Sequence, residues 1–193
     1  MNKLAFFLCF LMMTPCLFAQ HHMENSIGYA DSVNSGIIVS DTMKGSPHRV
    51  TMTNIGNAHV HIEYGSPGVK GRIIWGGLVA YDKVWVAGAH NATIISFGKD
   101  VIFGGKHIPA GMYGFFAIPG KDKWTVILNS KAEMHLADEY EEKNDIARIE
   151  VKPVALKKEV PRLTYIIKET GKNKGDVILQ WDRLEVTIPV SAK

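Results

Sequence analysis

The sequence predicts an all-β domain, an antiparallel and jelly-roll-like β-sandwich, placed behind an export signal. About nine or ten short runs rich in β-branched and aromatic residues alternate with a period of two. Glycine, proline and asparagine separate these runs at intervals typical of a sandwich or barrel. Helical spacing appears in one place only, so we expect one short helical or irregular crossover near residues 131–144.

The first twenty residues have the pattern of a secretory signal peptide. Lys3 provides a positive charge, residues 4–13 are uninterruptedly apolar, and Ala19 is a small residue at the end. The apolar run is too short to be a permanent membrane span. We therefore expect residues 1–20 to be removed after Ala19 or Gln20 and the protein to be periplasmic or secreted. Lipid attachment at Cys16 is the alternative, although Pro15 beside it fits a lipoprotein signal poorly.

The composition of the mature chain excludes several function classes. Both cysteines, Cys9 and Cys16, lie in the signal, so the mature chain has no disulfide, thiolate metal site or cysteine nucleophile. The formal net charge of +3 falls to +2 when Lys3 leaves with the signal, and no basic stripe suggests nucleic acid as a partner. No second segment is long and apolar enough to span a membrane. One domain, residues 46–193, is expected to follow a flexible polar leader, residues 21–45.

The individual elements follow from local patterns. In the run 58–64, Val60, Ile62 and Tyr64 share one face while His59, His61 and Glu63 share the other. Segment 71–77 is expected to be a loop or short strand that packs Ile74 and Trp75. The other candidates for these nine or ten strands are 49–53, 84–86, 93–97, 100–103, 107–108, 111–118, 124–128, 147–151, 163–167, 176–181 and 184–190.

Histidines provide the candidates for a metal site. His90 in a loop could combine with His135 and Asp138, whose spacing of three puts them on one side of a helical turn. Two imidazoles and a carboxylate can hold zinc or another divalent cation with one position open. His48 or the pair His59 and His61 could add ligands. However, polar residues such as His59 and His61 are also expected on the outward face of a half-exposed strand.

A second candidate site is a ligand-binding surface near the glycine-rich turns. Aromatic faces beside cationic groups suit a sugar, a peptide or an anionic ligand. At least one of Trp75 and Trp85 is expected to fill the core instead. The candidate binding residues are Tyr64, Lys70, Arg72, Trp85, His90 and Asn91.

Several long motifs resemble one family. The stretches 64–72, 77–79, 83–85, 88–89, 110–120, 124–127 and 135–140 resemble the DUF2911 proteins, and the likeness runs from Ser46 to near Val190. The resemblance implies an exported bacterial protein with no assigned reaction. The chain departs from the family where many members read Tyr-Ser-Arg-Pro, here residues 64–67, and Trp-Arg-Thr-Gly-Ala-Asn-Glu, here residues 85–91.

The motifs of well-known enzyme classes are absent from the sequence, including the serine elbow, the phosphate loop and the zinc-protease helix. We therefore expect a non-catalytic envelope or secreted module that binds a small ligand, a glycan or an envelope protein. The alternatives are a metal-binding protein or metal-dependent enzyme that uses His90, His135 and Asp138, and a purely structural surface protein.

Overall fold

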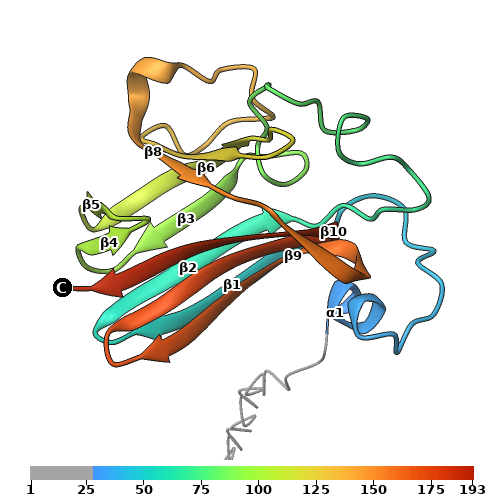
Figure 1. Ribbon diagram of the computed structural model, residues 1–193, viewed down its shortest axis with the longest axis horizontal. Helices are drawn as coiled ribbons and strands as arrows, with labels where there is room; N and C mark the ends of the chain where they lie inside the picture. The colour runs from blue at the N-terminus through green and yellow to red at the C-terminus, as the bar shows by residue number, and fades with distance from the viewer. Residues whose placement is uncertain (1–27) are drawn as a thin grey trace, which may run out of the picture.

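The chain folds into two facing antiparallel β-sheets, which confirms the predicted sandwich (Figure 1). This computed structural model describes residues 28–193. The predicted signal peptide, both cysteines and the first part of the predicted leader lie outside the described residues. Within residues 28–193, no helix is long and apolar enough to cross a membrane.

The larger sheet has six strands, and its neighbours are mostly consecutive in the chain. Its order is β1 (His48–Ile55), β2 (Ala58–Gly65), β3 (Thr93–Phe97), β6 (Gly111–Ile118), β7 (Trp124–Asn129) and β8 (Asp145–Val151). The second sheet has the order β5 (Lys106–Ile108), β4 (Val101–Phe103), β10 (Lys174–Ala192) and β9 (Val154–Gly171). The β4–β5 hairpin therefore leaves the first sheet between β3 and β6 and completes the second.

The last two strands are much longer than the sequence pattern predicts. The predicted runs 176–181 and 184–190 belong to one strand, β10, which shifts register against β9 on both sides of Asp182. Asp182 has a φ of 54°, in the left-handed region. A bulge of this kind keeps the ladder going while it bends the strand, so one continuous strand reads in sequence as two.

The sandwich core is built by the inward residues of both sheets. In β2, Val60, Ile62 and Tyr64 are buried, while His59, His61 and Glu63 face outward, as the alternation predicts. His61 Nε2 lies 2.9 Å from Glu63 Oε1, and His48 Nε2 lies 3.5 Å from Glu63 Oε2. These imidazoles and this carboxylate therefore satisfy one another on the outer face of the sheet.

Two segments expected to be a strand and a crossover, residues 84–86 and 131–144, are mostly irregular in the structure. Residues 84–86 are not a strand, because only an isolated bridge joins Trp85 to Ala117. The crossover at residues 131–144 is irregular, apart from the short 3-10 helix η1 (Glu142–Asn144). Both segments pack against β6 and β7 through side chains around Phe116. They are held by packing rather than by a regular ladder.

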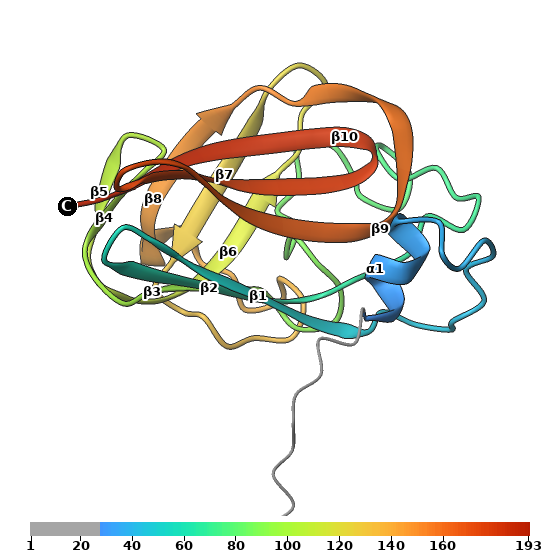
Figure 2. The ribbon, with the colours of Figure 1, turned by 90° about the horizontal axis from the view of Figure 1, so that it is seen from below.

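The described part of the predicted leader, residues 28–45, lies against the sandwich and is called the arm below. It contains the one-and-a-half-turn helix α1 (Tyr29–Asn34), which lies beside β9 (Figure 2). Asn34 Nδ2 donates to the carbonyl of Arg162 at 2.9 Å, and its Oδ1 accepts from the Arg162 amide at 2.8 Å. This pair of hydrogen bonds fixes the end of the helix to the strand.

Candidate functional site

The main candidate site is a pocket lined by the loop of residues 66–92 and by the arm. Both segments gather at the end of the sandwich away from the C-terminus (Figure 1). This main pocket has a volume of about 470 Å³, within the range of small-molecule sites. Most of its wall comes from the loop, with additions from the arm, the crossover and β10. It is lined by Gly45, Ser46, Pro67, Gly68, Lys70, Arg72, Leu78, Val79, Trp85, Val86, Gly88, Ala89, His90, Leu136 and Trp181.

All four tryptophans of the chain meet behind this pocket and form one indole cluster: Trp75, Trp85, Trp124 and Trp181. Trp85 and Trp181 line the pocket and stack on each other, with ring centroids 5.9 Å apart and planes 21° apart. Trp75 packs edge-on against the other three at 4.8 to 5.8 Å. At least one of Trp75 and Trp85 was expected to be a core residue, and both are half-buried side chains that pack against the core. Trp85 also lines the pocket.

The indole N–H groups differ in whether they have partners. Trp85 Nε1 donates to the Gly88 carbonyl at 3.0 Å, which fixes the ring against its own loop. The Nε1 atoms of Trp75, Trp124 and Trp181 are buried and have no partner within the described residues. Buried donors are normally paired. Of these three residues, Trp181 is the one that lines the pocket.

The polar part of the lining is cationic. Lys70, Arg72 and His90 all contribute to the wall, as the sequence predicts for a common site. Arg72 donates from Nε to the Val69 carbonyl at 3.2 Å and from Nη2 to the Gly68 carbonyl, so its guanidinium is folded onto its own loop. All the lining residues lie in the described part of the chain, and none is Asp or Glu. The lining therefore presents positive charge without a carboxylate of its own, although Asp41, outside the lining, interacts with the charge of Lys70.

The backbone around the pocket is held in unusual conformations. Lys70, His90 and Leu136 line the pocket with φ values of 49°, 68° and 52°, in the left-handed region that L-residues seldom adopt. The amide of Leu136 donates to the carbonyl of His90 at 2.8 Å and joins the crossover to the loop. Such conformations persist only where surrounding contacts enforce them, and they are common at ligand sites.

A buried ion pair that the sequence does not reveal fixes the arm beside the pocket. The side chain of Arg162 has no exposed surface, and its Nη2 lies 2.7 Å from Asp41 Oδ1. Arg162 also donates to the carbonyls of Ser66 at 2.9 Å, Met43 at 3.1 Å and Gly45 at 3.3 Å. Four contacts from one guanidinium therefore set the position of the segment that forms the pocket wall at Gly45.

The protonation of Asp41 reflects these neighbours. Burial raises the pKa of the Asp41 carboxyl, but the hydrogen bond and charge of Arg162 lower it more, helped by Tyr29 and Lys70. The net result is a pKa below the ordinary value. Asp41 is therefore held as a carboxylate, and its charge is matched by Arg162.

The other two predicted binding residues, Tyr64 and Asn91, lie around a smaller neighbouring pocket of about 200 Å³. Ser46, Ala89 and His90 line both pockets. Tyr64 is 3 % exposed, and its ring packs edge-on against Tyr165 at 4.8 Å, so it is chiefly a core residue. Asn91 is exposed, and its Oδ1 lies 3.4 Å from His135 Nδ1.

The predicted metal ligands are only partly brought together. The loop and the crossover do meet, through the Asn91–His135 bridge and the His90–Leu136 hydrogen bond. Among residues 28–193, however, no three His, Cys, Asp or Glu side chains are grouped so that they could hold a metal ion, and this includes His90, His135 and Asp138. The geometry gives the zinc hypothesis no support, and the ligand set stays a prediction.

The chain belongs to the family described as "Protein of unknown function (DUF2911)". The family model matches residues 46–190, which confirms the resemblance seen in the sequence and includes almost the whole sandwich. The arm and Asp41 precede the matched segment. No curated protein and no solved structure matches the chain.

Proposed function

We propose that this protein is a non-catalytic binding module of the cell envelope or the secreted fraction, and that it holds a small ligand in the main pocket. The observation that supports this most is the combination of a pocket of about 470 Å³ with a stacked pair of tryptophans and a cationic rim. Pockets that are mostly apolar with a few converging polar groups are typical of small-molecule sites.

The non-catalytic part of the proposal rests on the chemistry of the lining. Ser46 is the one hydroxyl-bearing residue in the wall, and no hydrogen bond joins it to His48 or His90 in the part of the chain described by the structure. Nucleophilic catalysis needs such a contact between nucleophile and base. Indoles, glycines and exposed cations are suited to holding a ligand by stacking and charge.

The location is supported by the sequence of the first twenty residues, which have the charge, apolar run and small-residue ending of an export signal. A ligand in the envelope or outside the cell would reach the pocket directly. The described domain has no cysteine and so needs no oxidant to fold there.

Indole fluorescence offers a direct test, because every tryptophan of the protein lies in the cluster behind the pocket. The mature protein is titrated with a panel of sugars, amino acids, peptides, aromatic acids and amines, and both emission and melting temperature are recorded. We expect at least one class to change the emission and raise the melting temperature saturably. Trp85→Ala should abolish both responses.

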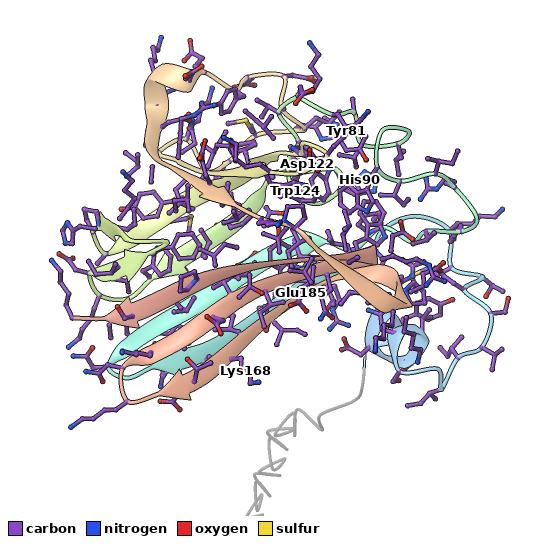
Figure 3. All side chains as sticks on the ribbon, in the orientation of Figure 1. Tyr81, His90, Asp122, Trp124, Lys168 and Glu185 are labelled. Carbon is purple, nitrogen blue, oxygen red and sulfur yellow. The ribbon has the colours of Figure 1, made fainter. Side chains whose placement is uncertain are left out.

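The control variant is Lys168→Ala, an exposed lysine of β9 that lies well away from His90 (Figure 3). It should bind like the wild type. A panel in which no class gives a saturable response, or in which Trp85→Ala binds as well as the wild type, would refute the proposal. Turnover of a hit compound that is lost with His90→Ala would replace the binding module by an enzyme.

A further inference from the structure

We infer that the ligand of the main pocket is an organic anion with a flat, unsaturated ring, of the class of arene carboxylates. This rests on the proposed function and narrows it to one chemical class. Three independent features of the pocket lead to it: its charge, the aromatic pair in its wall and the unpaired donor of Trp181.

The charge of the wall selects the sign of the ligand. Lys70 and Arg72 bring two permanent positive charges, His90 adds an imidazole, and no carboxylate within the described chain lines the pocket. Two carboxylates outside the lining have other partners: Asp41 pairs with Arg162 and also interacts with the charge of Lys70, and Glu63 lies beside His48 and His61. A concavity that is lined by cations and by no carboxylate attracts and holds an anion.

The cations have donors left for such an anion. Arg72 donates Nε and Nη2 to loop carbonyls, which fixes the plane of the guanidinium and leaves Nη1 free among the described residues. Lys70 makes one hydrogen bond, to the Met43 carbonyl, and an ammonium has three donors. Both side chains are thus oriented by the protein before a ligand arrives, which lowers the cost of binding.

The aromatic pair selects the shape of the ligand. Trp85 and Trp181 stack with nearly parallel planes, and the hydrogen bond to Gly88 prevents Trp85 from turning. Flat rings stack on such a surface with a larger contact than a puckered ring makes. Leu78 and Leu136, which are 50 % and 42 % exposed, extend the apolar surface toward solvent.

The third feature is the indole N–H of Trp181. This residue is 1 % exposed and lines the pocket, and among residues 28–193 its Nε1 has no hydrogen-bond partner. A carboxylate or other ring substituent with an acceptor oxygen would satisfy it. A neutral hydrocarbon ligand would leave it unpaired.

Isothermal titration of the mature protein with three matched probes tests the inference. The probes are 2-naphthoate, its neutral isostere 2-naphthamide, and decahydronaphthalene-2-carboxylate, which keeps the charge but not the flat ring. We expect 2-naphthoate to bind at least about tenfold more tightly than either of the others, because a charge-assisted hydrogen bond and a stacked ring are each worth about that factor. Its affinity should also fall as salt is added.

Two variants locate the charge effect. Lys70→Met and Arg72→Met should each weaken 2-naphthoate roughly tenfold and leave 2-naphthamide unchanged, whereas Lys168→Met should change neither. Both pocket residues are exposed, so the variants should fold, and their melting temperatures check this.

The outcomes separate this inference from the proposed function. Equal binding of 2-naphthoate and 2-naphthamide, or of the flat and the saturated acid, would overturn the inference while the pocket remained a binding site. The inference also fails if none of the three probes binds although another class from the wider panel binds in a Trp85-dependent way. If neither the three probes nor any compound of the wider panel binds, the proposed function itself is refuted.

Discussion

Replacing Asp41 by alanine should destabilise the whole domain, although Asp41 lies in the arm, outside the matched family segment. The substitution leaves Arg162 as a fully buried charge without a counter-ion. Removing one partner of a buried pair costs about 3–5 kcal/mol. Arg162 keeps the carbonyls of Ser66, Met43 and Gly45, so we expect the lower end, about 3 kcal/mol.

Urea unfolding followed by indole fluorescence measures this free energy. The midpoint should fall without a change in the slope, because the surface exposed on unfolding stays the same. In a thermal scan the same loss corresponds to roughly 6–12 °C, given about 2–4 °C per kcal/mol for a chain of this size. A loss of less than about 1 kcal/mol would show that Arg162 does not depend on Asp41.

The double variant Asp41→Ala/Arg162→Met is the matched control. It removes both charges and fills the space of the guanidinium with an apolar side chain, so it should be more stable than Asp41→Ala alone. If the losses of the two single variants simply add in the double variant, the two side chains are not coupled and the reasoning fails.

The same pair predicts a pH dependence. Because the pKa of Asp41 is lowered in the folded state, its contribution is complete above the unfolded value of about 3.9 and is lost as the pH falls through the folded pKa. Wild-type stability should therefore fall below about pH 4 more steeply than that of Asp41→Ala. Parallel curves for the two proteins would contradict this assignment.

Three further predictions concern the packing and the site. Trp124→Ala should cost about 3–5 kcal/mol in urea unfolding, because the ring is 1 % exposed and packs edge-on against Trp75 in the indole cluster. A loss below about 1 kcal/mol would show that the cluster is not tightly packed. Tyr165→Phe should cost about 1 kcal/mol, since its hydroxyl donates to the Ala87 carbonyl at 2.8 Å, and no measurable loss would mean that this bond adds nothing. The mature protein, purified without chelator, should contain far less than one metal ion per chain by mass spectrometry, and His90→Ala and His135→Ala should not change this. Near-stoichiometric metal that both variants lose would restore the metal hypothesis.

Most strands could be predicted because they follow from local chemistry. The alternation around Val60 and Ile62 sets which face of β2 is buried, whatever the rest of the chain does. The hairpin at Gly104 and Gly105 was predictable for a similar reason, as both residues have positive φ that glycine adopts at little cost. The bulge at Asp182 was not, because a bulge depends on the partner strand as much as on its own residues.

The candidate site likewise has some features that follow from local sequence and others that depend on distant residues. The sequence by itself placed Lys70, Arg72 and His90 near glycine-rich turns, where binding residues are often displayed, but it assigned Trp85 to a strand, 84–86, that the structure does not form. It also determined most of the strands, since period and turn spacing are properties of neighbouring residues, whereas the division of these strands into two sheets rather than a closed barrel came from the structure.

Only the tertiary structure decided which distant residues meet. Trp181 in the last strand completes the pocket wall with Trp85, and Asp41 in the arm neutralises Arg162, which lies 121 residues further along the chain. Neither contact has a local signature, because each depends on how the two sheets and the long loop pack. A buried arginine and four converging indoles are products of that packing, and sequence periodicity carries no information about it.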